Sequence, residues 1–128
     1  MTARAIELSP LAAPLAVARL PADAPLPEWS RQGDFLTITR SAAELSIVCA
    51  ATVVPAKVEH AGPFAGFYVH GPLDFTEVGI LAALTRPLAE ARISVFAISS
   101  YDTDTLLVPL DQAEAARACW RAAGFEVH

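Results

Sequence analysis

The stretch GPLDFTEVGILAALTRPLAEARISVFAISSYDTDTLLVP, residues 71–109, decides the fold. Its first part carries apolar side chains at helical spacing, namely Ile80, Leu81, Leu84 and Leu88. This pattern predicts a helix over residues 79–91, bent or loosened in its last turn by Pro87. Segments rich in Ile, Val and Leu then predict two strands, over residues 93–99 and 105–108, which are joined by a turn.

The same alternation continues on both sides of this stretch. Residues 67–70 are a β-rich run that ends at a Gly-Pro pair, which breaks strands. Downstream, Asp111 and Glu114 have the spacing of a capping box, which predicts a second helix. Gly124 ends that helix, and residues 125–127 are a short final strand. The predicted order is therefore β-α-β-β-α-β.

The first half of the chain repeats this order more weakly. Its predicted elements are strands at 16–20, 35–39 and 44–49, with single helical turns at 25–31 and 51–57. Nothing in the composition marks a linker between the halves. We therefore expect an α+β protein of two ferredoxin-like β-α-β-β-α-β units, residues 1–66 and 67–128, with antiparallel sheets and helices on one face. The strand at 67–70 closes the first unit and opens the second.

Composition and charge exclude several classes of protein. Hydrophobic residues make up 54% of the chain and the formal net charge is −5. Such a chain can bury a core, but it lacks the basic surface that nucleic acids and anionic membranes require. The prolines in the N-terminal region disfavour a signal peptide, and no apolar run is long enough to cross a bilayer. Cys49 and Cys119 have neither metal nor redox spacing, and reduced, buried thiols suit a cytoplasmic location.

Several short motifs carry a family resemblance. In the second half they are GPLDF at 71–75, GIL at 79–81, PLAEA at 87–91, ISVF at 93–96, SSYDTD at 99–104 and LV at 107–108. In the first half they are LP at 20–21, PEW at 27–29, LSIVC at 45–49 and VP at 54–55. Together they resemble the bacterial ACT-domain proteins related to the CASTOR arginine sensors, over nearly the whole chain. The chain departs from the family pattern at Arg92, where a glycine is usual, and at Ser100, where many relatives have threonine.

This resemblance implies a function and a site. ACT units are regulatory modules that bind an amino acid or a similar small effector at the interface between units, and members of this branch are free-standing proteins. It implies a homodimer that regulates a partner protein the sequence does not name. The residues that it assigns to the ligand are Asp74, Phe75, Glu77, Gly79, Ile80, Ser94, Val95, Ser100, Tyr101 and Asp104. Of these, Ser94 and Val95 would come from a partner unit.

The residues themselves support such a site. Backbone N–H groups at a helix start near Gly79 can hold a carboxylate, and the absence of a side chain there lets a ligand approach closely. Asp104 or Glu77 suits an ammonium group or a basic side chain. The alternative is that Gly79 only ends a turn and that the aspartates at 102 and 104 only bond their own backbone.

Other chemistries find little support in the sequence. Asp102 and Asp104 stand in a short turn without a nearby histidine, so they are expected to be solvated and not a catalytic pair. His60, His70 and His128 lack the spacing of metal ligands, and we expect no metal, cofactor or catalytic residue. The leading function is therefore amino-acid binding by a non-enzymatic regulator. The alternatives are an interaction module without a small ligand and an enzyme with an unrecognised site.

Overall fold

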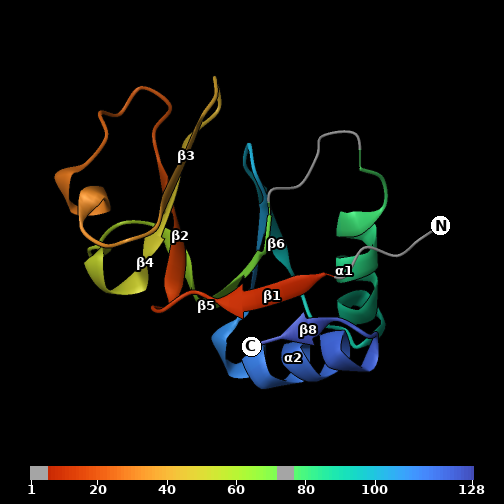
Figure 1. The fold of residues 1–128 in the computed structure, drawn as a ribbon. Coiled ribbons are helices and arrows are strands. Elements are labelled where there is room, and N and C mark those ends of the chain that lie inside the picture. The colour runs from red at the N-terminus through yellow and green to blue at the C-terminus, as the bar shows by residue number, and fades with distance from the viewer. Residues whose placement is uncertain (1–5, 72–76) are drawn as a thin grey trace. The chain divides into compact units, whose positions relative to one another are not determined.

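The computed structural model describes residues 6–71 and 77–128 and divides into two units (Figure 1). One unit comprises the residues up to Ala12 together with Ala65–His128, and the other comprises Ala13–Phe64. The sequence predicts one unit over residues 1–66 and the other over residues 67–128. Residues 7–10 belong with the C-terminal half, because they form a strand that pairs there.

The C-terminal unit has the predicted β-α-β-β-α-β order. Its elements are the second part of β5 (His60–Val69), α1 (Ile80–Glu90), β6 (Phe96–Ser99), β7 (Asp104–Pro109), the 3₁₀ turn η3 (Leu110–Gln112), α2 (Ala113–Ala122) and β8 (Glu126–Val127). Strand β1 (Glu7–Pro10) is inserted between β5 and β8, antiparallel to the first and parallel to the second. The sheet order is therefore β6-β7-β5-β1-β8. Sequence reasoning missed β1, which is only four residues long and ends in a proline.

Along the chain, the N-terminal unit has the same succession of strands and helical segments, but its helical segments are shorter. Its elements are β2 (Leu15–Leu20), η1 (Glu28–Arg31), β3 (Leu36–Arg40), β4 (Leu45–Ala50), η2 (Ala51–Val53) and the first part of β5. The antiparallel order is β3-β4-β2-β5, and both helical positions hold a single 3₁₀ turn. The prediction of two ferredoxin-like units that share a strand is confirmed. The shared strand β5 begins at His60. In the sequence, the nearby Gly62 and Pro63 are more typical of a loop than of a strand.

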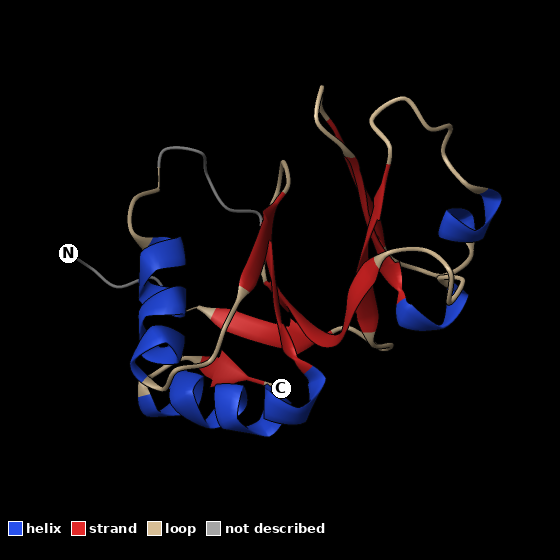
Figure 2. Ribbon diagram, turned by 180° about the vertical axis from the view of Figure 1, so that it is seen from behind, coloured by secondary structure: helices blue, strands red, loops and turns tan. Residues whose placement is uncertain are grey.

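The two helices of the C-terminal unit pack against its sheet (Figure 2), and their buried side chains belong to the same core as those of the strands. Leu84 and Leu88 of α1 and Trp120 of α2 are fully buried. The Trp120 ring packs edge-on against Phe67, with ring centres 5.1 Å apart, and its indole N–H donates to the carbonyl of Leu84 at 2.8 Å. Trp120 is thus a core residue. Among the described residues, no helix is both long and apolar enough to cross a membrane.

Arg92 follows the end of α1 in a backbone conformation that usually requires glycine. Its φ is 60°, in the left-handed region that favours glycine. The N–H of Arg92 donates to the carbonyl of Ala89 at 3.1 Å, and that of Ile93 donates to the carbonyl of Leu88 at 2.9 Å. Ile93 and Leu88 are also both buried. These two bonds and the apolar contact form a Schellman motif, which stops the helix before the chain turns toward β6.

The start of α2 differs from the prediction. Asp111 lies inside η3, the residue before α2 is Gln112, and no side chain caps the helix. The predicted capping box is therefore wrong, because the 3₁₀ turn that follows Pro109 already includes the proposed cap. Glu114 instead forms an ion pair with Arg117, three residues later on the same helix.

The two cysteines differ in their environment. Cys49, on β4, is fully buried, and burial raises the pKa of its thiol. Cys119, on α2, is only half-buried, and neither thiol is in a disulfide. The expectation of a buried, unreactive thiol therefore holds for Cys49 and only in part for Cys119.

Candidate functional site

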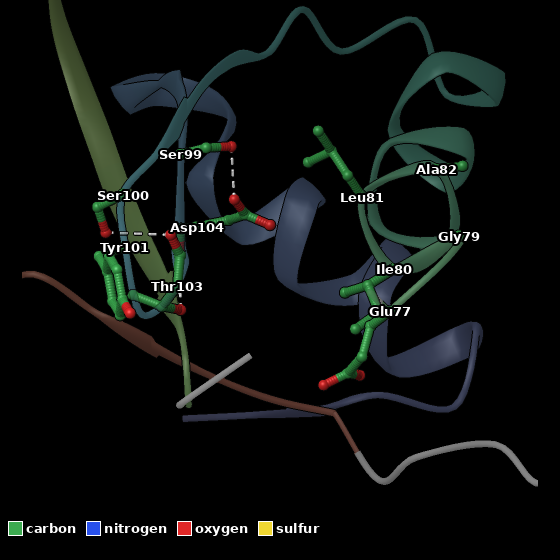
Figure 3. A pocket seen from close by; sticks show the side chains of 10 residues that line it. All are labelled: Glu77, Gly79, Ile80, Leu81, Ala82, Ser99, Ser100, Tyr101, Thr103 and Asp104. Carbon is green, nitrogen blue, oxygen red and sulfur yellow. Dashed lines mark hydrogen bonds between the residues drawn. The ribbon is translucent and has the colours of Figure 1, made fainter. Parts of the chain in front are cut away.

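A cavity of about 340 Å³ lies between the start of α1 and the β6–β7 turn of the C-terminal unit (Figure 3). Six of the residues that the resemblance assigns to a ligand line it: Glu77, Gly79, Ile80, Ser100, Tyr101 and Asp104. Four further residues complete the lining: Leu81, Ala82, Ser99 and Thr103. Segments about twenty residues apart in the sequence thus form the two walls of one cavity.

The first wall is the start of α1. Gly79 has φ 86° and ψ 0°, which an L-residue adopts only with strain, and a Cβ added there would meet no atom within 4 Å. A glycine is therefore required by the backbone and not by crowding. Because Gly79 has no side chain, it cannot cap the first N–H groups of the helix, which begin at Ile80. These groups and the helix dipole give this wall a partial positive charge.

The second wall is the turn that joins β6 to β7. Ser100 closes it, because its N–H and its hydroxyl both donate to the carbonyl of Thr103, at 2.8 and 3.1 Å. The hydroxyl of Thr103 donates in turn to the carbonyl of Val69 on β5. The turn is therefore attached to the middle of the sheet. A wall held in this way presents its side chains in a defined geometry.

Asp104 supplies the negative charge of the second wall. It is the first residue of β7, lies half-buried, and accepts a hydrogen bond from the Ser99 hydroxyl at 2.6 Å. One carboxylate oxygen makes this bond, and the other projects into the cavity on the side of α1 (Figure 3). The hydrogen bond of the Asp104 side chain therefore joins it to Ser99 on the neighbouring strand β6 and not to its own backbone. A negative group on one wall faces a partly positive helix start on the other.

Of the other predicted residues, Ser94 and Val95 do not line this cavity within one chain. Asp74 and Phe75 lie outside the described residues. Ser94 and Val95 were expected on a strand, but β6 begins only at Phe96, so they lie in the segment that follows α1. Val95 lines a different hollow of about 320 Å³, together with α1 residues that include Arg86.

Sequence reasoning missed Ser99 and Thr103, which hold the second wall in place. Both belong to the SSYDTD motif, but their small polar side chains suggested only a turn. The signal that could have found Ser99 is strand register, since in the β6–β7 hairpin it pairs directly with Asp104. No comparable local signal marks Thr103, because its partner on β5 is 34 residues away.

Comparison with known proteins places the chain in a family. A family model of the ACT domain matches residues 60–119, and a model of a separate N-terminal domain family matches residues 14–57. Protein Atu0741 from Agobacterium tumefaciens has a similar structure, with 34% sequence identity and a TM-score of 0.91 over 98% of this chain and 94% of that one. The chain belongs to the same family as Atu0741, and its residues 60–119 match the ACT-domain model.

Two further solved structures share the fold of this chain. Protein VC0802 from Vibrio cholerae is 21% identical, with a TM-score of 0.77 over 93% of this chain and 90% of that one. The regulatory subunit of aspartate kinase from Thermus flavus is 14% identical, with a TM-score of 0.59 over 94% and 97%. No curated protein sequence matches the chain. ACT domains are regulatory modules, so the match to the ACT-domain model favours a small-molecule-binding regulatory role.

Proposed function

We propose that this ACT protein is a regulator that binds an amino acid, or a similar small zwitterion, in the cavity at the start of α1. The observation that carries the proposal is that the uncapped N–H groups at the start of α1 lie across the cavity from the Asp104 carboxylate. The ligand carboxylate would accept hydrogen bonds from N–H groups of the first turn of α1, near Ile80. The ligand ammonium would donate to the free side of the Asp104 carboxylate, a charge-assisted bond.

The size of the cavity fits a small ligand. Its volume of about 340 Å³ lies at the lower end of the range of roughly 300–1,000 Å³ that small-molecule sites span. Leu81 and Ile80 add apolar surface on the helix side, which suits an aliphatic part of a ligand. Glu77 lies beside the start of α1 and adds a second carboxylate to that of Asp104. Two carboxylates would favour a ligand with a basic group.

The proposed working form is a homodimer. Strand β6 pairs with β7 and lies at the edge of its sheet, and its Phe96 side chain is 41% exposed. An exposed sheet edge with an apolar side chain is a surface that a second copy can cover. In such a dimer, Ser94 and Val95 of the second copy would complete the ligand site, as the resemblance to the CASTOR-related branch suggests. The regulator would act in the cytoplasm on a protein partner.

A thermal-shift screen against the twenty amino acids tests this proposal. A ligand at about 100 times its dissociation constant stabilises the folded state by roughly 2.7 kcal/mol, which a melting curve resolves easily. We expect one amino acid, or a small chemically related group, to raise the melting temperature. If none does, the protein is better described as an interaction module, whose exposed Val78 and Tyr101 would then be contact residues.

A further inference from the structure

A second cluster of polar side chains lies away from the cavity, on strands β5, β1 and β8. Leu8, Val69 and Val127 are neighbours across these strands and are buried in the core. Because side chains alternate along a strand, the residues next to them point to the opposite face of the sheet. Glu7, Ser9, His70 and His128 therefore share that face. We call these four residues the open-face cluster.

The side chains of the open-face cluster converge. Glu7 lies between the two histidines: one carboxylate oxygen is 3.4 Å from His70 Nδ1, and the other accepts a hydrogen bond from His128 Nε2. One potential ligand atom from each of these three residues lies within 4.8 Å of the others. The histidine rings are also neighbours, with centres 5.9 Å apart. Two imidazoles and a carboxylate thus meet at one point.

The position of the His70 ring is fixed by two further contacts. Its Nε2 lies 2.6 Å from the Ser9 hydroxyl, and its face stacks on Tyr68 at 5.1 Å with the planes only 7° apart. When Nε2 carries the proton and donates to Ser9, the lone pair of Nδ1 faces Glu7. Metal-binding histidines are typically held in this way by a hydrogen bond to the second ring nitrogen.

We propose that Glu7, His70 and His128 bind a divalent transition-metal ion of the Zn²⁺ class, with Ser9 orienting His70. The donor set has the imidazole and carboxylate ligands that Zn²⁺ accepts, with bonds of roughly 2.0–2.2 Å. Tetrahedral angles at such bonds place ligand atoms roughly 3.3 Å apart. The Glu7 carboxylate is already 3.4 Å from His70 Nδ1, and the three ligand atoms all lie within 4.8 Å of one another.

The exposure of the cluster defines the kind of site. The side chains of His70, Glu7 and His128 are 35%, 36% and 49% exposed, so solvent reaches the metal position. Three protein ligands leave a fourth position for water, which distinguishes this from a closed, four-ligand structural site. The nearby Glu126 carboxylate, 3.7 Å from His128 Nε2, adds negative charge that favours a cation. Nothing in the amino-acid cavity takes part, so the two proposals stand or fall separately.

Calorimetric titration with Zn²⁺ tests the site, using full-length chain without a polyhistidine tag and stripped of metal by a chelator. We expect one ion per chain with micromolar or tighter affinity, and affinity lowered at least tenfold in His70→Gln, His128→Gln and Glu7→Gln. Ser9→Ala should weaken binding by about tenfold, as loss of an orienting hydrogen bond does. His60→Gln is the matched control, because His60 is exposed in the N-terminal unit and its Nδ1 bonds the backbone carbonyl of Val58.

Spectroscopy on the unaltered chain supplies a test that does not depend on the variants folding. Co²⁺ in place of Zn²⁺ should give the visible absorption of a four- or five-coordinate site with nitrogen ligands, and Zn²⁺ should abolish it. The proposal is overturned if wild type binds neither ion at micromolar concentration. It is equally overturned if the His70→Gln/His128→Gln double variant, folded by circular dichroism, binds Zn²⁺ as tightly as wild type.

Discussion

Arg92 and Gly124 occupy the same position in the two helices of the C-terminal unit. Each is the second residue after the last helical residue, with φ of 60° at Arg92 and 96° at Gly124. After each, the next N–H reaches back five residues, from Ile93 to Leu88 and from Phe125 to Trp120. The same left-handed helix end is thus formed once with a glycine and once without.

This equivalence predicts opposite effects of substitution at the two positions. Arg92→Gly should stabilise the fold by up to ~1 kcal/mol, because glycine adopts a positive φ without steric cost. Gly124→Ala should destabilise it by about 1 kcal/mol for the same reason, since a Cβ there would meet no atom within 4 Å and only backbone strain changes. Urea denaturation of both variants beside wild type measures the two signs. A destabilised Arg92→Gly would show that the arginine side chain contributes more than its backbone strain costs.

The contact between Trp120 and Leu84 predicts the cost of a core substitution. Trp120→Phe removes the indole N–H that donates to the Leu84 carbonyl and leaves a small cavity, so the free energy of unfolding should fall by about 1–3 kcal/mol. Trp29→Phe is the control, because Trp29 is only half-buried at the edge of the other core, and it should cost less. Thermal melts followed by circular dichroism compare them. Equal losses would mean that Trp120 does not anchor the two helices.

The role of Asp104 is predicted to be recognition and not stability. Asp104→Asn keeps an oxygen that can accept from Ser99 but removes the charge, so amino-acid affinity should fall about tenfold or more. The free energy of unfolding should change by no more than about 0.5 kcal/mol. Asp102→Asn, an exposed position in the same turn, should change neither quantity. Calorimetric titration and a melting curve on each variant make the comparison, and unchanged affinity in Asp104→Asn would return this residue to a turn-forming role.

The exposed edge strand β6 predicts the oligomeric state. The chain should be a homodimer by light scattering at micromolar concentration, and Phe96→Glu should shift it toward monomer by placing a charge on the shared edge. Leu110→Glu is the matched control, because Leu110 is also 41% exposed but lies in η3 and not on that edge. If the wild type is a monomer, the dimer proposal is wrong. Ser94 and Val95 of a second copy then cannot contribute to the ligand site.

The success of sequence reasoning depended on how far apart the interacting residues are. Helix α1, the β6–β7 hairpin and the helix end at Arg92 follow from local spacing, so they were predictable. Strand β1 was not, because its partners lie some sixty and one hundred and twenty residues away. The open-face cluster depends on the same long-range pairing, since Glu7 and His128 are 121 residues apart. The predicted start of α2 was wrong for a local reason. Residue types alone do not distinguish a 3₁₀ turn before a helix from a helix cap.

The most direct test of the central claim is to map amide chemical shifts while titrating the amino acid that the thermal screen selects. The account predicts that the largest changes fall on the first turn of α1, at Ile80, Leu81 and Ala82, and on the β6–β7 turn at Ser100 and Thr103. The N-terminal unit should change little. Shifts centred on any other part of the chain, with these amides unmoved, would contradict the assignment of the cavity as the ligand site.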